Sequence, residues 1–205
     1  MSVRSLNPPQ QPRKMRILGV DPSVAGRTGY GLIEIDGSSA RPMRFGALRF
    51  PDSLTFAVRL REIHFLISGL VEQFSPDAVA VESVFAALNI RTALKLAEMR
   101  GVVLLAAAQA QIPAHSYSPR EVKASVAGFG GASKQQIQQM VRSLLGLAEI
   151  PQHADVTDAL AVALCHAQAL RLRERMALQS QHGFAVDRGA GGSSRAASVS
   201  VSRGR

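Results

Sequence analysis

The sequence contains almost no cysteine and no long apolar run. Its one cysteine, Cys165, excludes a disulfide framework and a cysteine-rich zinc module, and is typical of a reducing compartment. Its longest apolar runs, such as residues 102–108, are far shorter than the roughly 20 residues of a membrane-spanning helix. Residues 1–15 contain no apolar segment of the signal-peptide type. These absences predict a soluble, cytoplasmic protein with no membrane partner.

Acidic residues are few relative to basic ones. The 205 residues include 24 Lys and Arg against 15 Asp and Glu, a formal net charge of +9. Such an excess favours polyanionic partners, nucleic acid above all. Residues 1–14 carry +3 and residues 171–205 carry +5, whereas residues 15–170 hold 14 basic and 13 acidic residues. The overall charge is therefore weak support for any particular partner of the folded part.

Composition divides the chain into three parts. Residues 1–14 are rich in Pro and Gln, and residues 176–205 are rich in Gly, Ser and Arg, which is typical of disordered extensions. Between them, no internal repeat or long linker interrupts the chain. Because 46% of the sequence is hydrophobic, residues 15–175 can form one domain with its own core.

The order of periodic segments predicts an α/β fold. Apolar and β-branched runs predict strands, and spacing of three to four residues predicts helices. The expected strands are residues 15–21, 28–36, 43–50, 77–82 and 113–118; the expected helices are residues 54–75 and 90–109, two short helices, and residues 154–173. Three consecutive strands followed by strand–helix alternation indicate a five-stranded mixed sheet flanked by helices.

Four carboxylates occupy positions that this order can bring together. Asp21 and Glu82 end the first and fourth strands, so their side chains project from adjacent strand ends if these strands are neighbours. Asp155 and Asp158 are three residues apart on the last helix and can point from one face. Taken singly, each acid also fits a turn, a solvated strand end or a favourable position near a helix N-terminus.

Four carboxylates in one place predict a metal site. Like charges a few ångström apart repel in a low-dielectric cleft, and divalent cations relieve that repulsion. Ligands that are all oxygen favour Mg²⁺ or Mn²⁺ over Zn²⁺. Two such ions can activate a water and stabilise the leaving oxygen in phosphodiester hydrolysis, so the predicted chemistry is that of a nuclease.

Four sequence blocks resemble a known family. They are ILGVDPSVAGRTGYGLIE, AVESVFAALNIRTALKLAEMRGV, YSPREVKASVAGFGGASKQQIQQMV and HADVTDALAVALCH. In order and spacing they are similar to the successive motifs of the RuvC family of Holliday junction resolvases, over nearly all of residues 17–170. The fold that this resemblance implies is the RNase H-like one.

The resemblance implies roles for individual residues. Asp21, Glu82, Asp155 and Asp158 match the catalytic acids that bind two Mg²⁺ ions per subunit, with Mn²⁺ as a substitute.

Three further positions match DNA-binding residues of the family. Lys123 and Lys134 match basic cleft residues that approach the DNA backbone and the scissile phosphate, and Phe85 matches an aromatic that stacks on bases at the junction centre. A solvated surface charge for each lysine and ordinary core packing for Phe85 remain alternatives.

The resemblance also implies an activity and partners. The expected protein is a homodimer that resolves four-way DNA junctions in recombination and repair by nicking two strands of like polarity, leaving 5′-phosphate and 3′-hydroxyl ends. Its expected partners are the junction DNA and a branch-migration complex of RuvA and RuvB type proteins. Two other classes remain open: a junction-binding protein without catalysis, and an ATPase or kinase with an actin-like fold. The latter needs a second similar domain, which a chain of this length lacks.

The first motif departs from the family pattern. Ser23 stands after Pro22 where the family usually has glycine, and the loop that follows is one residue longer than usual. If glycine is needed there for a positive φ or a close backbone approach, Gly26 is the candidate to replace it.

Overall fold

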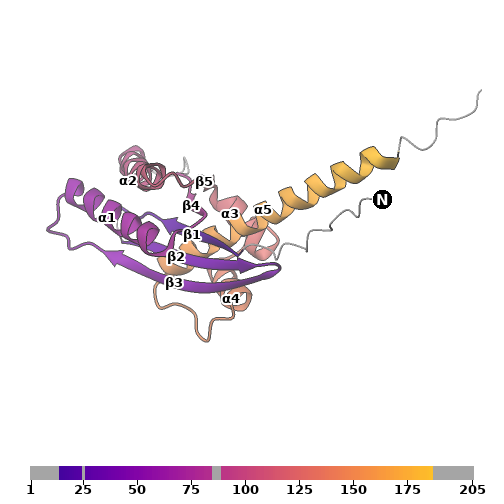
Figure 1. Cartoon of the computed structure of the whole chain (residues 1–205). Helices are drawn as coiled ribbons and strands as arrows, with labels where there is room; N and C mark the ends of the chain where they lie inside the picture. Colours follow the sequence, from indigo (N-terminus) through magenta and orange to yellow (C-terminus); the bar gives the residue numbers. More distant parts are fainter. Residues whose placement is uncertain (1–13, 25, 85–88, 187–205) are drawn as a thin grey trace, which may run out of the picture. The chain divides into compact units, whose positions relative to one another are not determined.

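The computed structural model describes residues 14–24, 26–84 and 89–186 of the chain. Residue contacts divide the protein into two compact units, Met1–Ala169 and Leu170–Arg205. All five strands and the first four helices belong to the first unit (Figure 1). No helix in the described part of the chain is long and apolar enough to span a membrane.

The elements follow the predicted order. The strands are β1 (Met15–Asp21), β2 (Arg27–Asp36), β3 (Ser39–Arg49), β4 (Ala78–Glu82) and β5 (Ala114–Tyr117). The helices are α1 (Phe56–Phe74), α2 (Ile90–Gln109), α3 (Pro119–Ala127), α4 (Lys134–Leu145) and α5 (Ala154–Val186). α5 continues past its predicted end at residue 173, and its residues from Leu170 onward belong to the second unit.

The five strands form one mixed sheet in the order β3-β2-β1-β4-β5. β2 is antiparallel to both β1 and β3, whereas β4 is parallel to β1 and to β5. The prediction that the first and fourth strands are neighbours is therefore confirmed. Val20 pairs with Val81, and the next residues along these parallel strands are Asp21 and Glu82.

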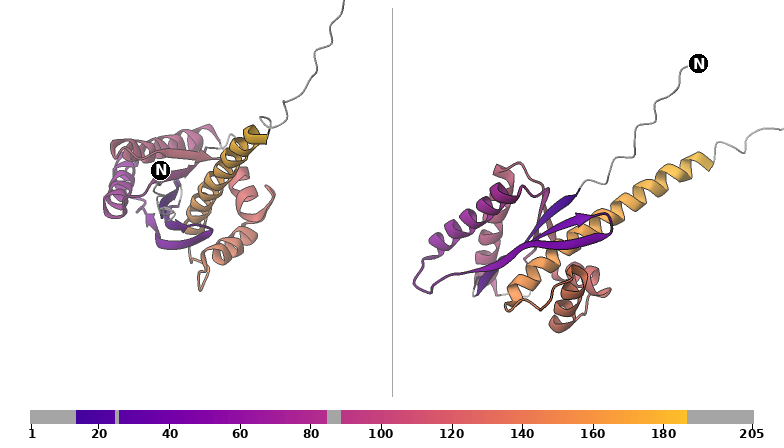
Figure 2. Two further views of the ribbon diagram at one scale, coloured as in Figure 1. Left: turned by 45° about the vertical axis from the view of Figure 1, so that its right-hand side comes forward. Right: turned by 60° about the horizontal axis from the view of Figure 1, so that its bottom comes forward.

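One face of the sheet carries the main hydrophobic core. α1 and α2 cover this face, as the views in Figure 2 also show. Its buried side chains include Leu18, Val20, Leu32, Val79 and Val81 from the strands and Ile63, Ile67, Met99 and Val103 from the helices. Because successive strand residues face opposite sides, residues 17, 19, 29, 31 and 33 face the other layer.

α5 lies very close to that second face because glycines remove side chains between helix and sheet. A Cβ on Gly19 would lie 2.1 Å from the carbonyl oxygen of Ala159, and a Cβ on Gly31 would lie 2.6 Å from Leu160 Cδ2. The interior of α5 is accordingly well buried, with Ala159, Leu160 and Ala163 all inaccessible to solvent. This close approach places the first turn of α5 directly over the sheet.

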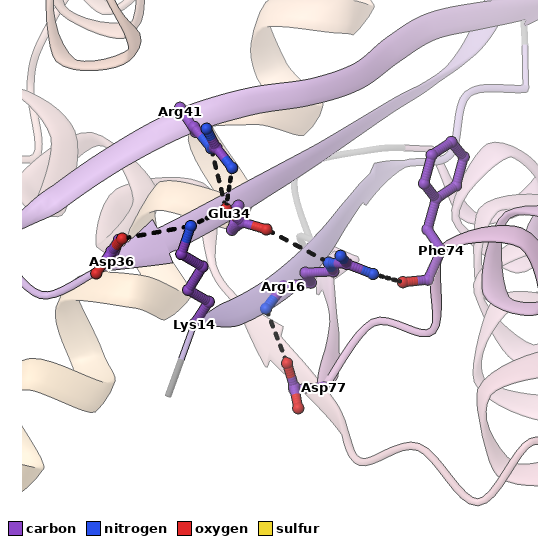
Figure 3. Close-up of polar contacts among 7 residues, drawn as sticks. All are labelled: Lys14, Arg16, Glu34, Asp36, Arg41, Phe74 and Asp77. Atoms are coloured by element: carbon purple, nitrogen blue, oxygen red, sulfur yellow. Dashed lines mark hydrogen bonds and ion pairs between the residues drawn. The ribbon is translucent and has the colours of Figure 1, made fainter. Parts of the chain in front are cut away.

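A polar network holds the opposite end of the sheet in register (Figure 3). The Arg16 backbone N–H donates to Asp77 Oδ2 at 2.8 Å, the Asp77 N–H donates to the Arg16 carbonyl at 2.8 Å, and the Arg16 guanidinium donates to the Phe74 carbonyl. These bonds tie the start of β1 to the turn before β4. Five residues further on, the same register places Asp21 beside Glu82.

α3 and α4 both begin with capping boxes. Ser118 Oγ accepts from the Glu121 N–H, and Glu121 Oε2 accepts from the Ser118 N–H at 2.7 Å. Ser133 and Gln136 repeat this arrangement at α4. The second cap fixes Lys134 as the first residue of α4.

Candidate active site

The four predicted acids lie at one edge of the sheet. Asp21 and Glu82 end β1 and β4, and Asp155 and Asp158 lie in the first turns of α5. The spacing of three residues puts both helical carboxylates on one side of α5. Three separate elements thus supply the cluster, and the strand pairing together with the close approach of α5 brings them together.

Asp21 lies among the other three carboxylates. Burial raises its pKa most, and the negative charge of Glu82 raises it further, so that this pKa lies well above the usual 3.8. Asp158 and Asp155 act in the same direction, whereas Lys134 lowers the pKa. Glu82, Asp155 and Asp158 are therefore all within electrostatic reach of Asp21.

Two lysines offset part of this negative charge. Burial raises the pKa of Glu82 most and Asp158 adds to the shift, while Lys123 and Lys134 lower it. Burial also raises the pKa of Asp158, against the effect of Lys134, whose Nζ lies 3.2 Å from Asp158 Oδ2. Burial is the largest single influence on Lys134 and lowers its pKa, but Asp158, Asp155 and Asp21 together raise this pKa above its usual value, so Lys134 stays protonated at neutral pH.

A cavity of about 210 Å³ opens beside the cluster. It is lined by Glu82, Pro119, Val122, Lys123, Lys134, Ile137, Asp158 and Ala161. Lys123 and Lys134 thus line the same cavity as Glu82 and Asp158, and their role in DNA binding stays a prediction. Phe85, the third predicted DNA-binding residue, lies outside the described residues.

Gly29 couples two of the acids through the backbone. It is the register partner of Asp21, and a Cβ built on it would lie 1.9 Å from the carbonyl oxygen of Asp155 and 3.1 Å from the Val156 nitrogen. Any side chain at this position would displace the start of α5. This role of Gly29 was not predicted from the sequence. Glycines at alternate positions of β2, Gly29 and Gly31, are the signal that marks a strand closely approached by another backbone.

A network of Tyr and His side chains next to Glu82 was also not predicted from the sequence. Tyr117, the register partner of Glu82 on β5, shares a hydrogen bond of 2.6 Å with Nδ1 of the buried His166 on α5. The ring of His166 also stacks on that of His115 at 4.3 Å. The backbone N–H of Ser83 donates to the Tyr117 carbonyl at 2.8 Å, so this network fixes the chain next to Glu82.

The loop after Asp21 is anchored from α1. Arg59 Nη1 donates to the Val24 carbonyl at 3.4 Å, and Arg59 Nε donates to the Leu54 carbonyl. A Cβ on Gly26 would meet only Ser23 Oγ, at 3.4 Å, which is ordinary van der Waals contact. Close packing therefore does not require glycine at position 26.

The donor set fits a hard divalent cation. All four side chains offer carboxylate oxygens, the ligands that Mg²⁺ and Mn²⁺ prefer, and their mutual repulsion is relieved by positive charge. In residues 14–24, 26–84 and 89–186, no three acidic, histidine or cysteine side chains are placed closely enough to enclose a metal ion. Part of the charge balance comes instead from Lys134, through its ion pair with Asp158.

The fold and the acids at its edge define an RNase H-like nuclease architecture. Two structures of Thermus thermophilus RuvC, one described as a complex with Holliday junction substrate, align with TM-scores of 0.71 and 0.72 at 34% identity, covering 77% of this chain and 96% of theirs. The yeast mitochondrial Holliday junction resolvase Ydc2 shares the fold at a TM-score of 0.55 and 14% identity, over 74% of this chain and 77% of that one.

Sequence relationships identify the family. The model of the family "Crossover junction endodeoxyribonuclease RuvC" matches residues 17–166. A protein of that name from Desulfitobacterium hafniense is 48% identical over 162 residues, 79% of this chain and 98% of the relative. Another, from Chloroflexus aurantiacus, is 44% identical over 164 residues, 80% and 99% of the two chains. The chain belongs to the RuvC family.

Proposed function

We propose that this protein is a crossover junction endodeoxyribonuclease that resolves four-way DNA junctions in the cytoplasm during recombination and repair. The observation that carries the proposal is the convergence of Asp21, Glu82, Asp155 and Asp158 at one sheet edge, in a chain of the RuvC family. Membership of a family that includes a structure with a Holliday junction substrate supports junction DNA as the substrate. The products would carry 5′-phosphate and 3′-hydroxyl ends.

The four carboxylates are the residues that would hold two Mg²⁺ ions, with Mn²⁺ as a substitute. When bound, such ions supply a water nucleophile at neutral pH and stabilise charge on the phosphate and the leaving oxygen. Their binding would relieve the repulsion that raises the pKa of Asp21.

The lysines contribute positive charge of their own. Lys134 is protonated, lies beside Asp158 and lines the cavity together with Lys123. In this position the two ammonium groups would orient the scissile phosphate and stabilise the charge that develops on it. Phe85 would stack on bases at the junction centre, a role that rests on the sequence motif alone.

A homodimer would supply two such sites for the symmetric cleavage of a junction. An exposed apolar stripe on α2 supports this assembly. Its members recur on one helical face and are Ile90, Leu94, Ala97, Gly101, Leu105 and Ala108. Ile90 is 81% exposed and Leu94 is 60% exposed, which is costly in a free monomer. Leu94→Glu should shift the protein from dimer to monomer in sedimentation experiments; an unchanged dimer would move the interface elsewhere.

The domain boundaries remain part of the proposal. Residues 15–175 would form the nuclease domain. Of the two predicted basic extensions, residues 1–13 and 187–205 lie outside the described residues, and α5 continues to Val186. A branch-migration complex of RuvA and RuvB type proteins is the proposed partner on the junction.

The test is incubation of the purified protein with an end-labelled four-way junction, with and without Mg²⁺. The proposal is supported if paired nicks in strands of like polarity form with Mg²⁺ and do not form without it. Junction binding without nicking in either Mg²⁺ or Mn²⁺ would favour the binding protein without catalysis. Nucleotide hydrolysis without nicking would favour the ATPase class.

A further inference from the structure

Two arginines face each other across β2 and β3 with no acid between them. Arg27 and Arg49 are direct register partners in this antiparallel pair, so their side chains leave the same face of the sheet. Like charges in directly opposed positions destabilise a sheet. Arg49 is exposed and Arg27 is partly exposed, so both guanidinium groups can reach solvent.

Three basic residues at the opposite end of the sheet are paired with an acid. At the far end of β1 and β2, Lys14, Arg16 and Arg41 all lie within ion-pair distance of Glu34, as Figure 3 shows. Within the described part of the chain, Arg27 and Arg49 make no ion pair with an acid. The repulsion between them is thus not compensated inside the described protein, which points to an anionic ligand.

The pair lies next to the catalytic acids. Arg27 is two residues from Gly29 on the same strand, so Arg27 and Gly29 face the same layer, that of α5. Gly29 lies against the backbone of Asp155. The strand order places β2 and β3 on the side of β1 away from β4. Lys123 and Lys134 line the cavity at the β4 side. Positive charge therefore flanks the acids on both sides.

Building on the function proposed above, we propose that Arg27 and Arg49 form a clamp for the phosphodiester backbone of the DNA strand entering the site. Neighbouring strands are about 4.8 Å apart. Arg27 and Arg49 lie one and two strands to the side of Asp21, and both lie two residues beyond its register level. Guanidinium groups bind phosphate oxygens in bidentate fashion, which suits them to this task. Two neighbouring phosphates of one strand, one bound to each guanidinium, would also offset the repulsion between the arginines.

The experiment measures junction affinity against salt, in EDTA so that no cleavage occurs. Each phosphate contact contributes about 0.9 to the slope of log affinity against log salt. The double variant Arg27→Gln/Arg49→Gln should therefore lower the slope by about 1.8. Between 50 and 200 mM salt, the natural protein should lose about 12-fold more affinity than the double variant.

Arg44→Gln is the matched control. Arg44 is an exposed arginine on the same strand, but it pairs with Leu32, whose side chain belongs to the core of the opposite face. Its loss should leave the slope nearly unchanged. The clamp would be overturned if the double variant kept the same slope of log affinity against log salt as the natural protein. It would also be overturned if Arg49→Gln and Arg44→Gln lowered this slope equally.

Thermal unfolding without DNA provides a second readout. Because the two charges repel each other in the free protein, Arg49→Gln should raise the melting temperature or leave it unchanged. A lower melting temperature would assign the pair a structural role instead.

The outcomes separate the clamp from the proposed function. If the natural protein neither binds nor nicks a junction, the proposed function fails. If it does both and the salt slope is unaltered in the double variant, only the clamp fails.

Discussion

The Cα of Gly29 lies against the main-chain carbonyl of Asp155. A Cβ at this position would be 1.9 Å from the carbonyl oxygen, and Gly29 is also the register partner of Asp21. One glycine therefore sets the separation between the acid at the end of β1 and the acids at the start of α5. This backbone contact fixes the distance across the site more rigidly than any side-chain contact could.

Gly29→Ala should impair catalysis by moving Asp155 away from Asp21. A misplacement of about 1 Å can cost 100-fold in rate, so nicking in saturating Mg²⁺ should fall by at least about 100-fold. Metal binding measured by calorimetry should weaken in parallel. Gly69→Ala is the control, because a Cβ at this exposed position of α1 meets nothing within 4 Å. Full activity in Gly29→Ala would contradict the assigned contact.

Asp21→Asn should stabilise the protein when divalent cations are removed. The folded state raises the pKa of Asp21 above 3.8, so it binds a proton more tightly than the unfolded state does. Stability from this group is therefore lost as pH rises from about 4 through the raised folded pKa. Thermal unfolding in EDTA between pH 4 and 8 should show a weaker decline for Asp21→Asn and a higher melting temperature at neutral pH.

Asp52→Asn, at an exposed position outside the cluster, serves as the control for that pH series. The melting temperature of Asp52→Asn should match that of the natural protein at every pH. If the melting temperatures of Asp21→Asn and the natural protein depended identically on pH, the pKa of Asp21 would not be raised in the folded protein as the structure indicates.

Lys134→Gln should shift the pH profile of cleavage. Lys134 lowers the pKa of Asp158, Glu82 and Asp21, so its removal raises the pKa of all three acids. Because carboxylates must lose their proton to bind a cation, nicking should begin to fall at a higher pH than in the natural protein.

The maximal rate of Lys134→Gln should also fall about 100-fold, as for the loss of one preorganised donor to the transition state. Lys95→Gln is the matched control because Lys95 lies over the Phe56 ring, away from the acids. An unchanged pH profile of nicking in Lys134→Gln would remove Lys134 from the site.

Much of the architecture was predictable because it depends on local patterns. Alternating and helical periodicities gave the element order, and the capping boxes at Ser118 and Ser133 located the starts of α3 and α4. An acid such as Glu82 at the end of an apolar strand is hard to explain by solvation, which is why it could be singled out.

Features that depend on contacts between distant segments were not predictable. The close approach of Gly29 to Asp155 joins positions far apart in the chain, and the glycines of β2 do not indicate which segment approaches them. The bond between Tyr117 and His166 likewise appears only when α5 packs on β5. The end of α5 was also misplaced, because residues after 173 lack the apolar periodicity that signals a packed helix.

The most direct test of the catalytic site is Asp155→Asn. The substitution keeps the size of the side chain and removes the charge that the proposed metal site needs. Mg²⁺-dependent nicking of a labelled four-way junction should be abolished, while junction affinity in EDTA stays within about twofold, since phosphate contacts dominate binding. Nicking by Asp155→Asn at the natural rate would contradict the account.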